Sequence, residues 1–399
     1  MIKSVDRKPP VLILGGAQNA LSIARSLGRR GIDIYISVFE DEHALHTRYR
    51  TQCFPYSNKE TVHEFWMDLL FGENSHFLHG SVIFACGDDG VEFVAQNKNI
   101  LENKFILDDS MPEIQLAMLD KKNTLRMAKS LNIHIPNYWK IENIEDLGNI
   151  ASEVVFPVII KPIHSHLFQR QFNNKKYFFV NDLEELHDYM KKVFDANLRV
   201  MISEFIPGPD SLLWYYSTYI DSNGKPLFHF TKKIIRRFPK NEGLSCYQES
   251  EWNEEIAELG LKFFKGINFR GLGNVEFKKD PRDGYLKVIE CNARFIAPEE
   301  LFVRCGVDIA SIVYNHLVGL PVPEVNSYKQ NVGFWYPVRD FRAYLELRRK
   351  EEITFWAWVK SLLGKQVLPY FKWSDPMPSL KTFMNNVRRY FKRKLGYKS

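Results

Sequence analysis

The sequence has few cysteines and no long hydrophobic run. Its five cysteines are an odd number and show no CxxC spacing, which favours reduced, buried thiols in a cytosolic chain. No apolar stretch approaches the roughly 20 residues that a membrane-spanning helix needs. The short apolar run after the basic N-terminus ends in Gly15-Gly16, too early for a Sec-type signal peptide. We therefore expect a cytoplasmic protein that is neither exported by such a signal nor membrane-spanning.

Internal repeats, low-complexity tracts and Ser-His-Asp or Cys-His arrangements are also missing. The 399 residues are 45% hydrophobic and 26% charged, which is ordinary for a globular protein of two or three domains and excludes a disordered or fibrous chain. The net charge of +6 favours anionic partners such as phosphates or a membrane surface.

The first hundred residues alternate short apolar runs with amphipathic helical segments. The apolar runs are VLILGG, IDIYISVF, SVIFACGDD and KFILDD, and segments such as ALSIARSLGRRG and TVHEFWMDLLF lie between them. Buried strands that alternate with helices indicate a parallel sheet covered by helices on both faces. The sequence therefore predicts an α/β fold that begins with a Rossmann-like unit.

The next part of the chain reads as strands, helices and hairpins. The run FPVIIKPI places a single lysine, Lys161, near the end of an apolar strand, and Lys121 lies in the first turn of a predicted helix. Residues 212–221 and 226–238 are predicted to form two long strands, because the turn Ser222-Asn223-Gly224 between them is a strong hairpin signal.

A second predicted hairpin, NVEFKKDPRDGYLKVIECNARF, carries an unusual set of polar groups. With its turn centred on Asp283, strand pairing places Glu276 opposite Glu290, with Asn292 next on the same face. Two like charges opposite each other destabilise a sheet unless a positive charge lies between them. A Mg²⁺ ion would supply that charge. The alternative is a surface hairpin whose glutamates face solvent and in which Arg294 pairs with one of them.

Five segments in a fixed order resemble the ATP-grasp superfamily. They are LDK, FPVIIKP, SEFIPGPD, GNVEF and IECNAR, within roughly residues 10–325. The similarity points to the carboxylate-amine ligases, including the D-aspartate ligase type and proteins like the carbamoyl-phosphate synthase large chain. It implies an α/β (α+β) architecture with a Rossmann-like domain at 1–115 and an ATP-grasp domain at 116–325. Two α+β subdomains, about 116–208 and 209–325, would sandwich ATP, and 326–399 would be a Trp-rich, basic helical extension.

The resemblance implies nucleotide-binding roles for several residues. Lys121 and Lys161 match the lysines that bind ATP phosphates. The hinge that meets adenine through main-chain groups and a glutamate would comprise Glu204, Phe205 and Ile206. Asp210 resembles the acid that holds the ribose.

Metal and catalytic roles follow from the same resemblance. Glu276, Glu290 and Asn292 match the ligands of Mg²⁺, two ions being typical, with Mn²⁺ as a substitute. Arg294 matches the arginine that steadies the transferred phosphoryl group. In TKKIIRRFPKNEG, the cationic patch that would face phosphates or the substrate carboxylate comprises Lys233, Arg236 and Arg237. Which of the three point inward stays open.

One segment departs from the superfamily pattern. Many relatives have a glycine-rich loop over the phosphates, whereas HSHLFQRQFNNKKY contains no glycine. Fewer backbone amides could then approach the phosphates closely, so that Lys175 or Lys176 would substitute for them. His164 and His166 have no partner at a spacing that suits a metal site.

The implied reaction is ATP-dependent amide formation through an acyl phosphate, with ADP release. The substrates would be a small carboxylate and an amine, for example an amino acid joined to a cell-envelope, polysaccharide or natural-product precursor. Two alternatives to this function stay open: a thiol-ligating or carbamate-forming enzyme of the same fold, and a non-catalytic nucleotide-binding regulatory module. The protein could also form a homodimer.

The C-terminal tail has no acidic residue after Asp375. Within residues 379–398 an apolar stripe at helical spacing lies beside a basic face, and such a helix can lie at the anionic inner surface of a membrane. The alternative is a helix that packs on the catalytic body with its basic face in solvent. Nucleic acid is not expected as a partner, because the basic residues are confined to one terminal helix.

Overall fold

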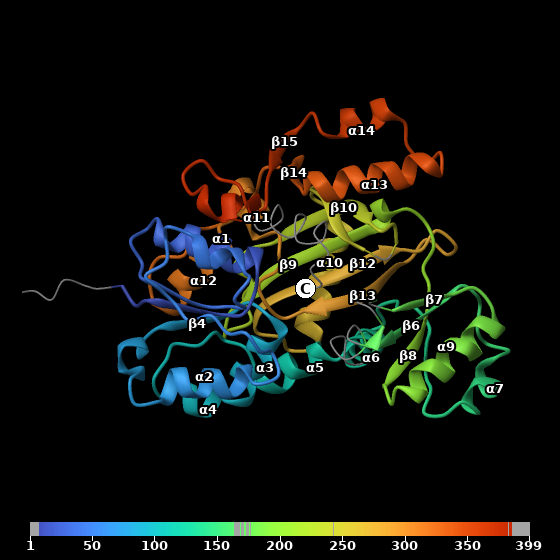
Figure 1. The fold of residues 1–399 in the computed structure, drawn as a ribbon, viewed down its shortest axis with the longest axis horizontal. Coiled ribbons are helices and arrows are strands. Elements are labelled where there is room, and N and C mark those ends of the chain that lie inside the picture. The colour runs from blue at the N-terminus through green and yellow to red at the C-terminus, as the bar shows by residue number, and fades with distance from the viewer. Residues whose placement is uncertain are drawn as a thin grey trace, which may run out of the picture.

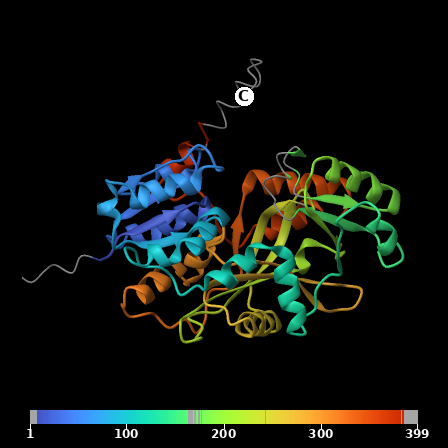
Figure 2. The same ribbon diagram turned by 90° about the horizontal axis from the view of Figure 1, so that it is seen from below.

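The computed structural model describes residues 8–162, 168, 171–172, 175, 177–241, 243–381 and 383–384. They form three β-sheets with helices packed on them, so the predicted α/β class is confirmed. A parallel sheet and a small antiparallel sheet lie at opposite ends of the molecule, with the largest sheet between them (Figures 1 and 2). Among the described residues no helix is long and apolar enough to cross a membrane. All five cysteines are free thiols.

The N-terminal sheet is parallel, with strand order β3-β2-β1-β4. Val11 of its central strand pairs with Ile34 on one side and Val82 on the other. Helices cover both faces, which explains why these strands are apolar along almost their whole length. The elements are β1 (Val11–Leu14), α1 (Gln18–Gly28), β2 (Ile34–Ser37), β3 (Gln52–Cys53), α2 (Val62–Phe71), β4 (Val82–Ala85), α3 (Asp88–Gln96) and α4 (Lys98–Leu101), with short 3₁₀ turns at His43–His46 and Ser75–Leu78.

Two consecutive helices lead into the small sheet. A single residue, Asp120, separates α5 (Pro112–Leu119) from α6 (Lys121–Ser130). The carboxylate of Asp120 caps α6 by accepting a hydrogen bond from the backbone N–H of Lys122 at 2.8 Å. This cap fixes Lys121 at the first helical position.

The small sheet is antiparallel, with strand order β5-β8-β6-β7. Helix α9 covers it with Leu186, Met190 and Val193, whose spacing puts them on one buried face. The elements are β5 (Tyr138–Lys140), α7 (Asp146–Ile150), β6 (Val158–Pro162), β7 (Phe178–Val180), α9 (Leu183–Asp195) and β8 (Val200–Glu204).

The large sheet has seven strands in the order β13-β12-β9-β10-β11-β14-β15, antiparallel except for the last pair. Both predicted hairpins are present: Phe230 pairs with Ser217, and Glu276 pairs with Glu290. Its elements are β9 (Leu213–Ile220), β10 (Phe230–Phe238), β11 (Leu244–Ser250), α10 (Glu254–Gly266), β12 (Gly271–Lys279), β13 (Leu286–Asn292), α11 (Glu299–Cys305) and α12 (Ile309–Leu317), with a 3₁₀ turn at Asp210–Leu212 before β9.

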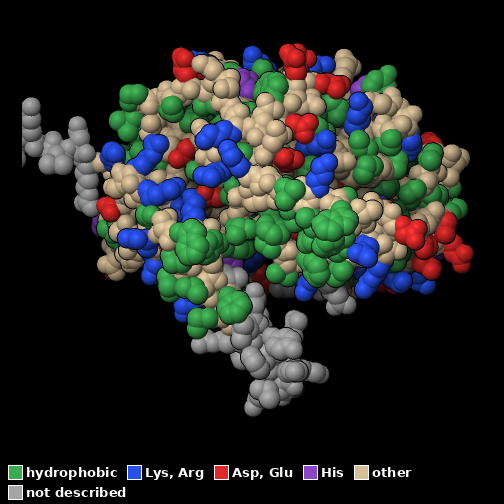
Figure 3. All heavy atoms as spheres, turned by 90° about the horizontal axis from the view of Figure 1, so that it is seen from above, with side chains coloured by type: hydrophobic (Ala, Val, Ile, Leu, Met, Phe, Trp, Pro, Cys, Tyr) green, Lys and Arg blue, Asp and Glu red, His purple; other side chains and the backbone are tan. Residues whose placement is uncertain are grey.

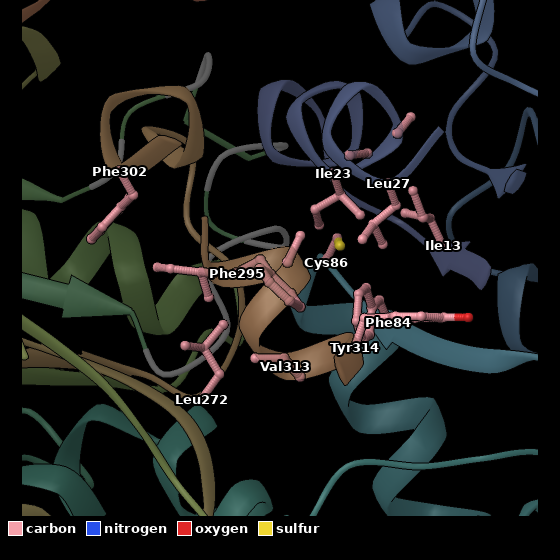
Figure 4. Packing of buried hydrophobic residues seen from close by; sticks show 14 of the residues in the cluster. Ile13, Ile23, Leu27, Phe84, Cys86, Leu272, Phe295, Phe302, Val313 and Tyr314 are labelled. Atoms are coloured by element: carbon pink, nitrogen blue, oxygen red, sulfur yellow. The ribbon is translucent and has the colours of Figure 1, made fainter. Parts of the chain in front are cut away.

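One continuous hydrophobic core joins the parallel sheet to the large sheet. Leu27 of α1 and Phe84 of β4 pack in the same cluster as Phe295, Val313 and Tyr314 (Figure 4). The rings of Phe84 and Phe295 lie 4.9 Å apart between centroids. Because these residues come from both ends of the sequence, the two sheets are held in a fixed relation to each other.

The segment 326–399, expected as a helical extension, also contributes strands. Strand β14 (Val332–Trp335) pairs with β11, and β15 (Lys365–Val367) pairs with β14. The helices of this segment are α13 (Pro337–Arg349) and α14 (Phe355–Ser361). These strands cover the edge that β11 would otherwise leave unpaired, which a sequence pattern of three or four residues does not reveal.

Buried ion pairs attach this segment to the rest of the molecule. Asp340 of α13 accepts hydrogen bonds from Arg236 Nε at 2.7 Å and Nη2 at 3.1 Å. The carboxylate of Asp375 accepts a hydrogen bond from Arg25 Nε at 2.8 Å. Both carboxylates are fully buried, so removal of either would leave an unpaired guanidinium in the core.

The Asp340→Ala variant tests this attachment. We expect it to lower the free energy of unfolding by about 3–5 kcal/mol, because Arg236 would keep a buried, unpaired charge. Urea denaturation followed by tryptophan fluorescence measures the change. Glu324→Ala, at an exposed position, is the control. A loss below about 1 kcal/mol in Asp340→Ala would contradict the proposed attachment.

Candidate active site

A cavity of about 390 Å³ lies between the small sheet and the large sheet. Its lining comes from the start of α6, from β6 and the end of β8, and from strands β9 to β13. The cavity gathers eight of the residues that the sequence singles out: Lys121, Lys161, Glu204, Phe205, Ile206, Arg237, Glu276 and Glu290. We call it the central cavity.

The floor of the central cavity is the hairpin of β12 and β13. Glu276 and Glu290 are direct cross-strand partners, as the sequence predicts, and a register irregularity follows Glu276. Glu276 is buried, and the side chain of Glu290 is 39% exposed. Burial and the neighbouring Glu290 carboxylate raise the pKa of Glu276. The surface-hairpin alternative is therefore wrong, because Glu276 faces the cavity rather than solvent.

Tyr215 holds the Glu276 carboxylate from the next strand. The two residues pair across β9 and β12, and the Tyr215 hydroxyl donates a hydrogen bond to Glu276 Oε2. Burial, followed by the Glu276 charge, raises the pKa of Tyr215 well above its ordinary value, so the hydroxyl keeps its proton as a donor. Sequence reasoning missed Tyr215, because only the pairing of β9 with β12 shows which aromatic residue of this strand faces the glutamate.

Two lysines approach the carboxylates from the small-sheet side. Lys121 Nζ lies 4.0 Å from Glu290 Oε1. Lys161, near the end of β6, also lines the cavity, where burial and then the positive charge of Lys121 lower its pKa to about 8. Two cations thus face two carboxylates across one cavity, which suits an anionic ligand that carries its own counter-cation.

Arg237 and Lys278 add positive charge to the same cavity. Arg237 Nε donates to Asp210 Oδ1 at 2.8 Å, and its backbone N–H donates to Oδ2 at 2.9 Å. Lys278 Nζ donates to the carbonyl oxygen of Ile206 at 2.6 Å, and burial lowers the pKa of Lys278 to about 8. Lys278 is two residues beyond Glu276, so strand alternation would have placed it on the same face.

The predicted hinge forms one wall of the cavity. The Glu204 carboxylate accepts hydrogen bonds from the backbone N–H of Asn137 at 3.0 Å and from Arg282 at 2.6 Å. The ring of Phe205 packs edge-on against Phe179, with centroids 4.9 Å apart. These contacts hold the apolar ring of Phe205 next to the carboxylate of Glu204. This arrangement suits a ligand with a flat, partly polar ring.

Three predicted cations lie outside the cavity lining. The sequence places Arg236 among the catalytic candidates, but its guanidinium points to α13 and pairs with Asp340. The reason is an irregularity in the pairing of β10 around Arg236, which leaves Arg237 on the cavity side. Lys233 lies 3.9 Å from Glu251, and Arg294 Nε lies 2.5 Å from Asp88 Oδ1 in the first turn of α3.

Two further predicted residues also do not line the cavity. Asp210 is buried, and both of its carboxylate oxygens accept hydrogen bonds from Arg237. Asn292 pairs with Asn274 on the hairpin, two residues along each strand from the glutamate pair. Their expected roles toward ribose and metal stay predictions.

Part of the glycine-free segment lies outside the described residues. His164, His166 and Lys176 belong to that part. Lys175 is described, and its Nζ lies 5.4 Å from the centroid of the Phe178 ring.

No family model matches the chain. Among curated proteins, D-aspartate ligase of Enterococcus faecium is 25% identical over 331 residues, which cover 78% of each chain. A carbamoyl phosphate synthase large chain of Caldanaerobacter subterraneus is 28% identical over 242 residues, 58% of this chain and 21% of the relative.

Several solved structures also resemble this chain. The biotin carboxylase domain of Hydrogenobacter thermophilus 2-oxoglutarate carboxylase superimposes with a TM-score of 0.63 and 17% identity, covering 81% of this chain and 73% of that one. For L-amino acid ligase from Bacillus licheniformis the TM-score is 0.58 at 17% identity, covering 78% and 75%. The chain has the ATP-grasp fold. The resemblance that the five ordered segments suggest is thereby confirmed.

Because the pKa values of Lys161 and Lys278 are both lowered to about 8, we expect anion binding in this ATP-grasp cavity to depend on pH. Above about pH 8 Lys161 loses its proton and with it the positive charge that attracts an anion. One pH unit above the pKa only about a tenth remains protonated, so loss of this charge should weaken sulfate binding up to about tenfold at pH 9. Titration calorimetry from pH 7 to 9 measures the effect; sulfate keeps a constant charge over this range.

The matched variant is Lys161→Arg, whose guanidinium stays charged throughout. We expect its sulfate affinity to fall less steeply with pH than that of the unmodified protein. Equal slopes in the two proteins would show that Lys161 does not set the dependence.

Proposed function

We propose that the protein is an ATP-dependent carboxylate-amine ligase that forms an amide or peptide bond and releases ADP and phosphate. The observation that carries this proposal is the central cavity itself. It holds the facing carboxylates Glu276 and Glu290 opposite the lysines Lys121 and Lys161, between two sheets of an ATP-grasp fold. D-aspartate ligase and L-amino acid ligase, which this chain resembles, are named for reactions of this class.

In this proposal the nucleotide enters along the hinge. The ring of Phe205, with Ile159 and Ile289, supplies an apolar surface for a base, and Glu204 lies at its edge. The phosphates would then extend toward Lys161 and Lys121. Phosphate oxygens and ammonium groups attract each other strongly in a partly buried site, so these lysines fix the direction of the nucleotide.

The residues present suit Mg²⁺ that is shared with a nucleotide. Glu276 and Glu290 supply hard oxygen ligands, and Mg²⁺ in nucleotide sites typically takes one or two carboxylates with phosphate oxygens completing its shell. Among the described residues no three His, Cys, Asp or Glu side chains come together as a metal site, which agrees with a need for ligand phosphates. When bound, the ion would neutralise charge on the phosphates. It stays a prediction that two ions bind, that Mn²⁺ can replace Mg²⁺, and that Asn292 is a metal ligand.

The chemistry needs positioning and charge neutralisation rather than a covalent nucleophile. A substrate carboxylate oxygen attacks the γ-phosphorus of ATP, the bond to the bridging oxygen breaks, and ADP leaves. The amine then attacks the acyl carbon, loses a proton, and inorganic phosphate leaves. Lys161 and Lys121 would hold the transferring phosphoryl group, and Arg237 would stabilise negative charge from the large-sheet side.

An amino acid is the proposed substrate class, because D-aspartate ligase and L-amino acid ligase are named for amino acids. The other partner, the homodimer and the cell-envelope, polysaccharide or natural-product precursor stay predictions. We place the reaction in the cytoplasm, where ATP is available and the five free cysteines would stay reduced.

A screen for ADP release over amino acids and carboxylated sugars, with ATP and Mg²⁺, tests the proposal. Once a substrate pair is found, Glu290→Gln and Lys161→Ala should each lower substrate-dependent ADP release at least about a hundredfold, as expected for loss of groups that stabilise transition-state charge. Exposed Lys279, beside the cavity residue Lys278, gives a control variant, Lys279→Ala, that should keep its activity.

Full activity in Glu290→Gln or Lys161→Ala would refute the assigned site. Nucleotide binding in the unmodified protein without ADP release on any carboxylate would favour the regulatory-module alternative. Release that depends on a thiol or on bicarbonate rather than an amine would favour the other two chemistries.

A further inference from the structure

Helices α13 and α14 and the chain after β15 present an unusual number of exposed apolar side chains. Val338, Trp356, Leu363 and Trp373 are 72%, 76%, 77% and 88% exposed, and α14 has no buried residue at all. Figure 3 looks onto this side of the molecule and shows hydrophobic side chains in a band, with Lys and Arg on both sides of it. We call this surface, formed by residues 338–373, the C-terminal face.

The aromatic residues of the C-terminal face are held in place from below. Trp358 stacks on Tyr344 with ring centroids 4.7 Å apart, and its indole N–H donates to Asp340 at 2.9 Å. The ring of Phe355 packs against both Trp358 and Trp356. Because the buried Asp340 anchors this stack, Trp356 is presented to solvent by a fixed support rather than by a loose loop.

A cationic groove of about 510 Å³ lies beside Trp373. Four basic residues line it, together with Phe371 and Trp373: Arg29, Arg304, Lys329 and Lys372. Glu300 is the acidic residue of the lining, and it pairs with Lys372 at 2.5 Å. Three cations of the groove are thus not neutralised by its own lining, and the groove favours an anion.

We propose that the C-terminal face docks the protein on an anionic lipid surface. Tryptophan is the side chain that best suits the boundary between headgroups and acyl chains, because its ring is apolar and its N–H is polar. Exposed Trp356 and Trp373 would enter that boundary, and the cations of the groove would meet lipid phosphates. This surface is distinct from the basic tail at 379–398, most of which lies outside the described residues.

The charges argue against a second copy of the chain as the occupant. In a two-fold symmetric dimer a surface meets itself, so the cations of the groove and its flanks would approach their own counterparts. Protein interfaces are also depleted in lysine, whereas Lys360 and Lys365 lie exposed between the two exposed tryptophans in the sequence. An anionic bilayer satisfies both the apolar band and the basic flanks.

Vesicle flotation of the full-length protein tests the proposal. We expect binding to vesicles of phosphatidylcholine with phosphatidylglycerol, weakening with salt, and little binding to phosphatidylcholine alone. The double variant Trp356→Ser/Trp373→Ser should bind at least about tenfold more weakly. Arg304→Gln/Lys329→Gln should lose about fivefold per charge removed, the factor expected for a basic residue at an anionic surface.

Trp252→Ser is the matched control, because Trp252 is also exposed but lies outside the C-terminal face. Its vesicle binding should equal that of the unmodified protein, and equal melting temperatures would show that all variants stay folded. Wild-type binding by the double tryptophan variant would overturn the proposal, since the contact would then lie elsewhere, for example in the basic tail. Equal binding to both vesicle types, or a dimer in solution that needs the two tryptophans, would also overturn it.

Discussion

The charge arrangement of the central cavity depends on two carboxylates, Glu276 and Glu290, that lie beside each other on the hairpin of β12 and β13. Glu276 and Glu290 repel each other across β12 and β13, and burial makes that repulsion stronger than it would be in water. The protein surrounds the pair with a hydroxyl donor from Tyr215 and with positive charge from Lys121 and other cavity residues. Cations and carboxylates thus line the same cavity, which favours a ligand that brings both anions and a cation.

Much of this site could be predicted, because it follows from strand alternation and hairpin register. A period of two residues places Glu276 opposite Glu290, and five short segments in order indicate the fold. The features that the sequence did not reveal depend on packing between distant parts of the chain. An irregularity in β10 turns Arg236 toward Asp340, and neither that irregularity nor the strands β14 and β15 leave a clear signal in the sequence.

Ion pairs between distant parts of the chain hold the cavity and the C-terminal segment in one body. Arg294, two residues beyond the end of β13, pairs with Asp88 in the first turn of α3. Arg25 of α1 holds Asp375, far along the sequence. These pairs join parts of the molecule that are far apart in the sequence, and the pair of Arg25 with Asp375 holds the chain after β15 against α1.

The central claim is that a substrate carboxylate takes the γ-phosphoryl group of ATP. The most direct measurement uses a carboxylate substrate labelled with ¹⁸O in both carboxyl oxygens. An acyl phosphate that an amine then attacks must leave one labelled oxygen in the released phosphate. We predict one ¹⁸O per phosphate, detected by mass spectrometry together with ADP. Unlabelled phosphate, or AMP in place of ADP, would contradict the account.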